Sequence, residues 1–307
     1  MAPELGTDAY YAAEAKVFGH YGLQPRSGML ALTEPHLRIR TVEVGSGEPV
    51  LLLHGFSLCT AQWAPLMSRL PGLRLIAIDM PGHGGSDPVD YTGTDLRQWY
   101  RRVLTAILDG LQLDRVHLVG HSQGAMLALF LALDAPDRVR SVTAVGTPAV
   151  AFGARLPSLR VLARPGLGPL LLSMPKPDPM YRRILRDSVG EHALATMPTD
   201  LVRATYLATR RPGFGSTVSS YLREMFRGLD AQPQRYVLAD DELARVRPPV
   251  SVLLGMQESR FQDLDEAARR VALIPGARFA TVAGDHEPWL DDLDTCAAYI
   301  SAALIMN

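Results

Sequence analysis

The sequence predicts an α/β protein with a mostly parallel central sheet and helices on both of its faces. Short apolar runs typical of strands alternate with longer runs typical of helices along most of the chain. Val50–Leu53 is a continuous apolar run, as expected for a strand buried on both faces of a parallel sheet. A Gly-x-Ser-x-Gly pattern at 120–124 separates a strand-like run from a helix-forming run, so the chain must turn sharply there.

Size and composition are consistent with one α/β core that carries an insertion. The chain has 307 residues, 47% of them hydrophobic, and a net charge of −1, which argues against general attraction to nucleic acid or a membrane surface. Cys59 and Cys296 give neither a disulfide framework nor a metal-ligand spacing, so we expect a reducing, cytoplasmic location. The N-terminal stretch does not resemble a signal peptide, and no apolar run approaches the length of a membrane span.

The N-terminal part of the chain is expected to form a helical extension followed by a strand. A helix over 8–22 begins at Asp8 and ends near Gly22. The run 37–44 alternates apolar and polar residues, as a half-buried strand does, and a Gly-Ser-Gly turn at 45–47 follows it.

Strands and helices then alternate up to residue 147. Each expected strand is a short apolar run that ends in a turn, and each expected helix fills the longer spacing between strands. The strands are expected at 50–53, 74–79, 115–120 and 139–145, and the helices at 61–70, at 94–111 and from Ser122 to about Leu133. A glycine-rich turn at 82–85 lacks the lysine and the spacing of a phosphate-binding loop.

Residues 148–240 differ in character, and we expect them to form a helical cap inserted into the core (1–147 and 241–307, with 1–30 as an extension). Seven prolines between 148 and 180 exclude long regular elements there. Helices are expected near 180–189, 199–211 and 216–229. The last carries an apolar stripe that either packs in the core or roofs a cleft. This segment holds 13 Lys and Arg against 7 Asp and Glu, a balance of +6.

The α/β alternation resumes after the cap. The apolar runs 250–254 and 278–283 are expected to be the last two strands. A closing helix is expected over 288–304, with Pro288 in its first turn, where the missing N–H of proline costs nothing.

Ser122 is the candidate nucleophile. A serine in a strand–turn–helix is held out of the sheet, and the helix N-terminus behind it favours negative charge. Any Cβ at Gly120 or Gly124 is expected to collide with the neighbouring strand or helix. A serine hydroxyl needs an adjacent base, and His286 is the candidate because it follows the last expected strand and precedes a helix start.

The acid that would orient His286 is less narrowly defined. Glu258 is the first carboxylate after the strand at 250–254, at the expected edge of the sheet. Asp263, Asp285 or a position after the preceding strand are the alternatives. Asp263 is expected instead to lie at the start of the next helix, whose dipole favours acids.

Two backbone N–H groups are expected to stabilise a developing oxyanion. One belongs to Gln123, the residue after the nucleophile, and the other to Phe56, which follows the buried strand in His54-Gly55-Phe56. The alternative interpretation of Gly55 is an ordinary tight turn. Other expected substrate contacts are His54, Gly55, Phe152, Phe214, Met225 and Phe226. Pockets are mostly apolar, and Leu170, Leu171, Leu172 and Met174 add to the apolar surface with which the cap could line one.

Four motifs together resemble the α/β-hydrolase superfamily in order and spacing. They are His54-Gly55-Phe56, Asp79-x-Pro-Gly-His-Gly-Gly-Ser86, Gly120-His-Ser-Gln-Gly124 and Gly284-Asp-His286. Within that superfamily the chain resembles the esterases, thioesterases and small-molecule hydrolases that carry a helical cap. The resemblance covers residues 30–304 and implies a catalytic triad of Ser122, His286 and Glu258. The chain departs from the usual pattern in having Glu258 in place of Asp, and Asp285 where Gly often precedes the histidine.

These observations predict a serine hydrolase of a carboxylic ester, thioester or lactone of a small lipophilic molecule, working without a cofactor or metal. The same triad could instead catalyse acyl transfer, cyclisation, elimination or carbon–carbon cleavage, because fold and triad do not fix the substrate. A non-catalytic ligand-binding protein is the third class. A small molecule is the expected partner, with an acidic carrier protein delivering a thioester as the alternative. Neither nucleic acid nor a membrane is expected.

Overall fold

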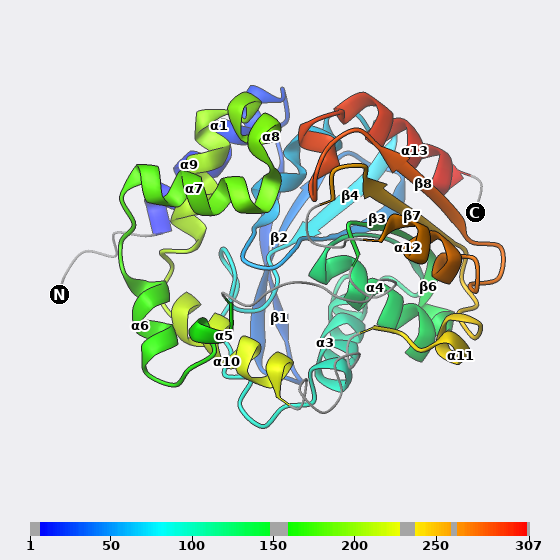
Figure 1. Cartoon of the computed structure of the whole chain (residues 1–307), viewed down its shortest axis with the longest axis horizontal. Helices are drawn as coiled ribbons and strands as arrows, with labels where there is room; N and C mark the ends of the chain where they lie inside the picture. The colour runs from blue at the N-terminus through cyan, green and yellow to red at the C-terminus, as the bar shows by residue number, and fades with distance from the viewer. Residues whose placement is uncertain (1–6, 148–158, 228–236, 259–262, 306–307) are drawn as a thin grey trace.

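An eight-stranded sheet forms the centre of the computed structural model, which describes residues 7–147, 159–227, 237–258 and 263–305 (Figure 1). The strand order is β1-β2-β4-β3-β5-β6-β7-β8. The strands are β1 (Arg26–Leu32), β2 (Leu37–Val44), β3 (Glu48–Leu53), β4 (Leu73–Ile78), β5 (Val116–His121), β6 (Val139–Val145), β7 (Val250–Gly255) and β8 (Arg278–Val282). Strands β3 to β8 are parallel to one another, and β1 and β2 run antiparallel to their neighbours. The predicted fold class is confirmed.

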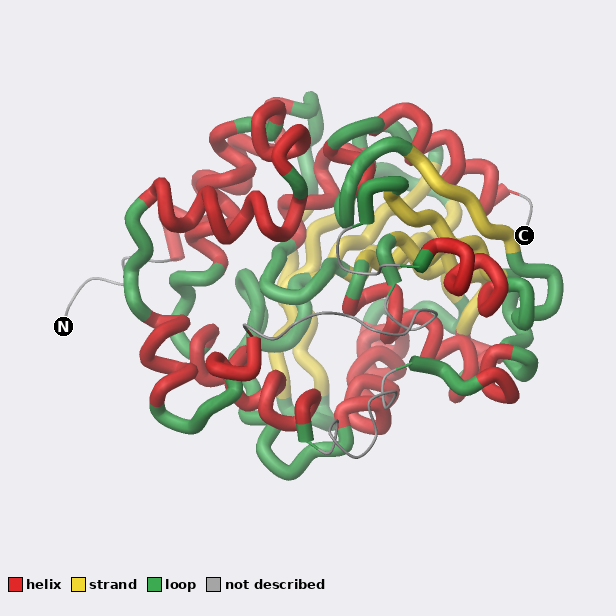
Figure 2. The backbone as a smooth tube through the Cα atoms, in the orientation of Figure 1, coloured by secondary structure: helices red, strands yellow, loops and turns green. Residues whose placement is uncertain are grey.

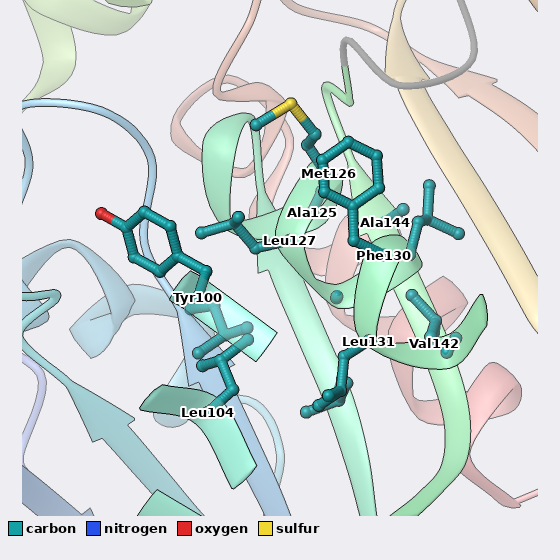
Figure 3. Packing of buried hydrophobic residues seen from close by; sticks show 14 of the residues in the cluster. Tyr100, Leu104, Ala125, Met126, Leu127, Phe130, Leu131, Val142 and Ala144 are labelled. Carbon is teal, nitrogen blue, oxygen red and sulfur yellow. The ribbon is translucent and has the colours of Figure 1, made fainter. Parts of the chain in front are cut away.

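Helices cover both faces of this sheet, as Figure 2 shows. The described helices other than α5 to α10 are α1 (Thr7–His20), α2 (Ala64–Met67), α3 (Leu96–Gly110), α4 (Gln123–Asp134), α11 (Asp240–Leu243), α12 (Leu264–Val271) and α13 (Leu293–Ile305). Short 3₁₀ helices add η1 (Thr60–Trp63), η2 (Pro136–Arg138) and η4 (Pro288–Leu290). Helix α4, which begins directly after Ser122, is apolar on all sides and is buried along most of its length (Figure 3).

Two hydrophobic cores form because successive side chains of a strand point to opposite faces. Leu51 and Leu53 of β3 pack with α3 and α4 in one core, whereas Val50 and Leu52 pack with α1 and α13 in the other. Burial on both faces accounts for the continuous apolar run at this strand.

Six of the described helices between β6 and β7, α5 to α10, form a unit that we call the cap. They are α5 (Leu159–Leu162), α6 (Leu167–Ser173), α7 (Asp178–Val189), α8 (Glu191–Thr196), α9 (Thr199–Ala208) and α10 (Phe214–Phe226). Helix α10 joins the α3–α4 core through Val218 and Leu222, whereas α7 and α9 join the α1–α13 core through Leu185 and Leu201. In Figure 1, α5 and α6 accompany α10 while α9 lies beside α1, in agreement with the contacts. The cap therefore rests on both cores.

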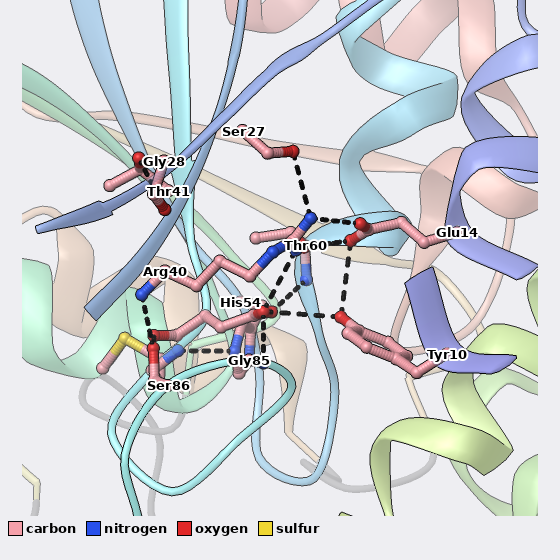
Figure 4. Close-up of polar contacts among 12 residues, drawn as sticks. Tyr10, Glu14, Ser27, Gly28, Arg40, Thr41, His54, Thr60, Gly85 and Ser86 are labelled. Atoms are coloured by element: carbon pink, nitrogen blue, oxygen red, sulfur yellow. Dashed lines mark hydrogen bonds and ion pairs between the residues drawn. The ribbon is translucent and has the colours of Figure 1, made fainter. Parts of the chain in front are cut away.

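A buried ion-pair network fastens α1 to the strands (Figure 4). Arg40 of β2 donates to Glu14 of α1 at 2.9 Å and to Asp79 at 3.3 Å. Asp79 also accepts hydrogen bonds from the backbone N–H groups of Thr60 at 2.9 Å and Gly85 at 2.8 Å. Burial alone would lower the pKa of Arg40, but the carboxylates of Asp79 and Glu14 raise it, so the guanidinium stays charged.

Three elements differ from the sequence prediction. Strand β1 was not expected, because most of its residues are exposed and its sequence lacks the alternation of a half-buried strand. The helix expected over 61–70 is shorter and consists of η1 and α2. The closing helix expected over 288–304 is two elements, with Pro288 beginning η4 and α13 starting only at Leu293.

Candidate active site

Ser122 occupies the turn between β5 and α4 in a strained backbone conformation. Its φ is 50° and its ψ is −114°, although a positive φ is uncommon for residues other than glycine. The turn is held by hydrogen bonds from Ser122 N to Val145 O at 2.8 Å and from Met126 N to Ser122 O at 3.0 Å. Strain held in this way by surrounding bonds is a feature of functional turns.

The two glycines of this turn are required by close packing. A Cβ at Gly120 would lie 2.5 Å from the backbone nitrogen of Ala125, and a Cβ at Gly124 would lie 2.0 Å from the carbonyl oxygen of Leu53. The predicted collisions with the neighbouring helix and strand are therefore confirmed. The Ser122 side chain itself is only half-buried, so substrate can reach it.

His286 and Glu258 meet at the carboxyl ends of β8 and β7. The Nδ1 atom of His286 lies 2.9 and 3.0 Å from the two carboxylate oxygens of Glu258. Both residues are buried, with 3% and 7% of their surfaces exposed. Because a carboxylate only accepts, Nδ1 carries the proton and donates it to Glu258. Nε2 is then the ring nitrogen that can accept a proton.

The carboxylate of the alternative acid Asp263 is occupied elsewhere. Asp263 caps α12 by accepting a hydrogen bond from Glu266 N at 2.7 Å. The backbone N–H of Asp285 donates to Asp291 at 3.2 Å, which ties down the turn before His286. Glu258 is the acid whose carboxylate is hydrogen-bonded to the His286 ring.

His286 lies beside the turn that carries Ser122. Its ring centroid is 4.8 Å from that of His121, the residue before Ser122, and His121 Nε2 donates to the carbonyl oxygen of His286 at 3.0 Å. Gly146, at the end of β6, approaches the same ring so closely that a Cβ there would lie 3.1 Å from Nδ1. The turns that carry Ser122, His286 and Glu258 therefore lie side by side at the ends of β5, β8 and β7.

Two buried histidines fix the turn that carries Phe56. His54 Nδ1 donates to Gly55 O at 2.7 Å, and its Nε2 accepts from Met80 N at 2.9 Å. The Nε2 atom of His83 accepts from Ser57 N at 3.3 Å. These bonds join the turn after β3 to the turn after β4.

Both histidines are held neutral. Burial lowers the pKa of His54, and burial together with the nearby His54 lowers the pKa of His83 to about 3. Neutral rings can accept the backbone N–H groups that they bind here. The turn is strained at Ser57, whose φ is 63°. The hydrogen bonds that His54 accepts from Met80 N and that His83 accepts from Ser57 N therefore stabilise an otherwise unfavourable conformation.

An aromatic wall joins the Phe56 turn to helix α10. The Phe56 ring lies 5.5 Å from that of Tyr221, and the His83 ring lies 5.6 Å from that of Phe214. The Val89 N–H also donates to Thr217 of α10 at 2.9 Å. The apolar stripe of α10 thus packs in the core and also faces the Phe56 turn, and its role as the roof of a cleft remains a prediction.

The other expected substrate contacts have different surroundings. Both ring nitrogens of His54 bind backbone groups, and a Cβ at Gly55 would lie 2.6 Å from His121 Nδ1. Met225 and Phe226 are half-buried at the end of α10, and Phe152 lies outside the described residues. Their contact with substrate remains a prediction.

Two cap residues do not fit the expected pocket. Leu170 and Met174 were expected to help line it, but 60% and 50% of their surfaces are exposed. The correction has a simple cause. Helix α6 packs on α10 through its glycine-containing face, which leaves these side chains on the outside.

Sequence reasoning missed the supporting residues His83, His121 and Asp291. The first two lie within the quoted motifs, so their position was available even though their hydrogen bonds were not. Asp291 accepts from the Asp285 N–H and pairs with His192 of α8 at 2.7 Å. This link between the cap and the His286 turn joins residues 99 positions apart and leaves no pattern in the sequence.

The described residues offer no group of three or more His, Cys, Asp or Glu side chains that could hold a metal ion. In the same part of the chain, no helix is long and apolar enough to cross a membrane.

Comparison with known proteins agrees with this architecture. The α/β hydrolase fold family matches residues 48–166. A 2-hydroxy-6-oxononadienedioate/2-hydroxy-6-oxononatrienedioate hydrolase of Paraburkholderia phymatum is 30% identical over 79% of this chain and 82% of its own length. A 2-hydroxy-6-oxo-2,4-heptadienoate hydrolase of Pseudomonas putida is 31% identical over 76% and 79%.

Solved structures show the same fold at lower identity. The carboxylesterase CesB from Bacillus subtilis superposes with a TM-score of 0.77 at 19% identity, covering 97% of this chain and 98% of its own. A 2-hydroxy-6-oxo-6-phenylhexa-2,4-dienoate hydrolase from Rhodococcus has a TM-score of 0.74 at 19% identity, covering 92% and 99%. The sequence relatives and the shared fold agree, and the chain belongs to the α/β-hydrolase family, as one of its hydrolases.

Proposed function

We propose that the chain hydrolyses a carboxylic ester, thioester or lactone of a small lipophilic molecule through an acyl-enzyme on Ser122. The observation that carries this proposal is the buried bond between His286 Nδ1 and Glu258, which orients the ring as a proton acceptor beside the strained Ser122 turn. His286 Nε2 would take the Ser122 proton as Oγ attacks the carbonyl carbon. It would then give that proton to the leaving group, and water would later release the acyl group by the same steps.

The oxyanion formed on attack needs fixed N–H donors. Gln123 is the first residue of α4, so its N–H has no acceptor one turn earlier in the helix. Phe56 lies in the turn that His54 and His83 hold in place. Donors that do not move during the reaction are the effective ones, and this supports the assignment of both N–H groups.

The lipophilic character of the substrate is argued from the wall beside this turn. Phe56, Tyr221 and Phe214 are aromatic, and His83 adds no positive charge because its pKa is lowered to about 3. Such a wall favours an apolar acyl or alcohol portion over a carboxylate.

Carbon–carbon hydrolysis of a 2-hydroxy-6-oxo-dienoate is the second candidate. It is favoured by relatives of that name at 30% and 31% identity over most of the chain. In that reaction Ser122 would attack the 6-oxo carbon, and the bond to the dienoate carbon would break after a proton reached that carbon. Such a substrate also carries a carboxylate, which needs a cationic partner that the aromatic wall does not supply.

One panel of assays separates these candidates. The protein would be given p-nitrophenyl esters and acyl thioesters of increasing chain length, and 2-hydroxy-6-oxo-2,4-heptadienoate in parallel. We expect the highest kcat/KM on a medium-chain or aromatic ester. A higher kcat/KM on the dienoate would replace the first candidate with the second.

Ser122→Ala tests the shared mechanism. The variant should fold normally and lose turnover of every substrate in the panel, and it should no longer react with a fluorophosphonate. Near-normal hydrolysis by a folded Ser122→Ala protein would contradict both candidates.

A further inference from the structure

Exposed apolar side chains are concentrated on one part of the cap. Ten large hydrophobic residues of the described chain are exposed, and six of them fall within α5 to α7 and the links between these helices. These six are Val161, Leu167, Leu170, Met174, Met180 and Ile184. Single exposed apolar residues are ordinary, but a cluster on one face indicates an interaction site.

Helix α6 and the residue that follows it carry three of these residues. Leu167 and Leu170 have the i, i+3 spacing of a single helix face, and Met174 follows the last residue of the helix. The opposite face is fixed, because a Cβ at Gly168 would lie 1.9 Å from Leu162 O and 2.5 Å from Ser219 Oγ of α10. Such close packing leaves the helix no room to rotate its leucines inward.

Helix α7 repeats this arrangement. Tyr181, Leu185 and Val189 are spaced four residues apart and are buried against the α1–α13 core. Met180 and Ile184 lie on another face of the same helix, with 53% and 44% of their surfaces exposed. The inner face is buried in the core, so the exposed apolar residues on the other face are not needed to hold the helix in place.

Basic residues flank the two apolar faces. Residues 159–189 contain six Lys and Arg against two Asp, a balance of +4. The Lys176 ammonium lies between the helices, 3.3 to 3.4 Å from three carbonyl oxygens at the end of α6. Arg164 and Arg183 are exposed beside these faces. The charge of −1 for the whole chain conceals this local excess.

We propose that the exposed apolar side chains of α6 and α7 and their basic flank, together called the outer face, bind the surface of an anionic phospholipid bilayer. Apolar side chains that enter the interface and cations that meet anionic headgroups are the two contributions that hold a protein reversibly on such a surface. A second copy of the chain fits less well, because a symmetric pairing would bring two positively charged faces together. The expectation of no membrane contact rested on the whole-chain charge, and this face revises it.

Vesicle co-sedimentation of the full chain tests the proposal. Binding is expected on phosphatidylglycerol vesicles, with little on phosphatidylcholine, and it should weaken as salt rises. The double variant Leu170→Ser/Ile184→Ser should lower the partition coefficient at least tenfold. Arg183→Glu should also lower it by about tenfold or more, because each basic residue near the surface contributes about fivefold.

Matched variants elsewhere on the surface distinguish binding through this face from non-specific adsorption to vesicles. Leu273→Ser removes an exposed leucine that lies outside the cap, and Arg101→Glu reverses an exposed charge on α3. Both variants should bind vesicles as the unchanged protein does. Ser122→Ala should also bind fully, so that failure of the proposed hydrolysis does not affect this test. Thermal melting would verify that all variants are folded.

Three outcomes would overturn the proposal. The first is absence of binding to phosphatidylglycerol vesicles. The second is binding by the double variant equal to that of the unchanged protein. The third is a loss of binding in Leu273→Ser or Arg101→Glu as large as the loss in the variants of α6 and α7. A dimer that sedimentation velocity detects and the double variant abolishes, without vesicle binding, would assign the face to a second copy instead.

Discussion

The turns at the carboxyl edge of the sheet and the cap above them are built by different means. At the edge, backbone strain at Ser122 and Ser57 is held by hydrogen bonds between neighbouring turns, and the titratable groups there are buried and paired. The cap consists of short helices interrupted by prolines, with apolar side chains left on its outside. The edge is therefore expected to tolerate little change, whereas the cap helices other than α10, which contacts the Phe56 turn, are expected to vary more freely in sequence.

The largest expected effect concerns the edge. Glu258→Gln should lower kcat by about 10² to 10⁴, because the amide can hold His286 in the wrong tautomer and cannot stabilise its charged form. Asp263→Asn is the matched control at the start of α12 and should lower kcat less than threefold. Steady-state kinetics on the best ester would measure both, and the reverse ranking would move the acid to Asp263.

Alanine substitutions at Gly84 on the edge and at Gly166 in the cap compare how much stability each region loses. Both have a positive φ, of 49° and 73°, so alanine costs backbone strain at each. A Cβ at Gly84 also meets the Asp79 carboxylate at 2.3 Å, whereas nothing lies within 4 Å of one at Gly166. Gly84→Ala should reduce the free energy of unfolding by about 2 kcal/mol more than Gly166→Ala does. Chemical denaturation would measure this, and equal losses would show that the edge yields as easily as the cap.

Acid should weaken the edge through His83. Its folded pKa of about 3 lies below its ordinary value of 6.5, so the folded state binds fewer protons, and stability falls as the pH drops from about 6.5 towards 3. Between pH 7 and 4.5 this group should account for about 2 to 3 kcal/mol of lost stability. His83→Gln should remove that part of the pH dependence. Identical pH dependence in both proteins, measured by denaturation, would show that His83 is not the titrating group.

The smallest effect is expected where the cap meets the His286 turn. His192 pairs with Asp291 at 2.7 Å, but 75% of its side chain is exposed, and exposed pairs contribute at most about 1 kcal/mol. His192→Ala should therefore change kcat/KM less than threefold. A tenfold loss would show that the cap helps to set the geometry of His286, and the contrast between the two regions would then fail.

Local patterns explain why the core and the triad candidates could be predicted. The continuous apolar run of β3 and the glycines around Ser122 each report a constraint that acts within a few residues. Glu258 was preferred over Asp263 from its place after a strand, and the structure gives it the His286 bond while Asp263 caps a helix.

Other features depend on contacts that no local pattern records. Strand β1 lies at the edge of the sheet and is mostly exposed, so burial left no alternation in its sequence. Leu170 and Met174 carry the composition of a pocket, but their direction is set by how α6 packs on α10. Amphipathicity predicts that a helix has two faces, and only the tertiary structure decides which face meets which neighbour.

The contact between α1 and α9 has a consequence for synthesis. Helix α1 leaves the ribosome well before the cap helix against which it packs, because that helix begins at Thr199, nearly two hundred residues later. At ordinary elongation rates that interval is on the order of 10 to 40 s. During this time Tyr10, Val17 and Phe18, which are buried in the finished protein, have only part of their partners. The nascent chain should thus present an apolar helix that chaperones can bind until the cap is made.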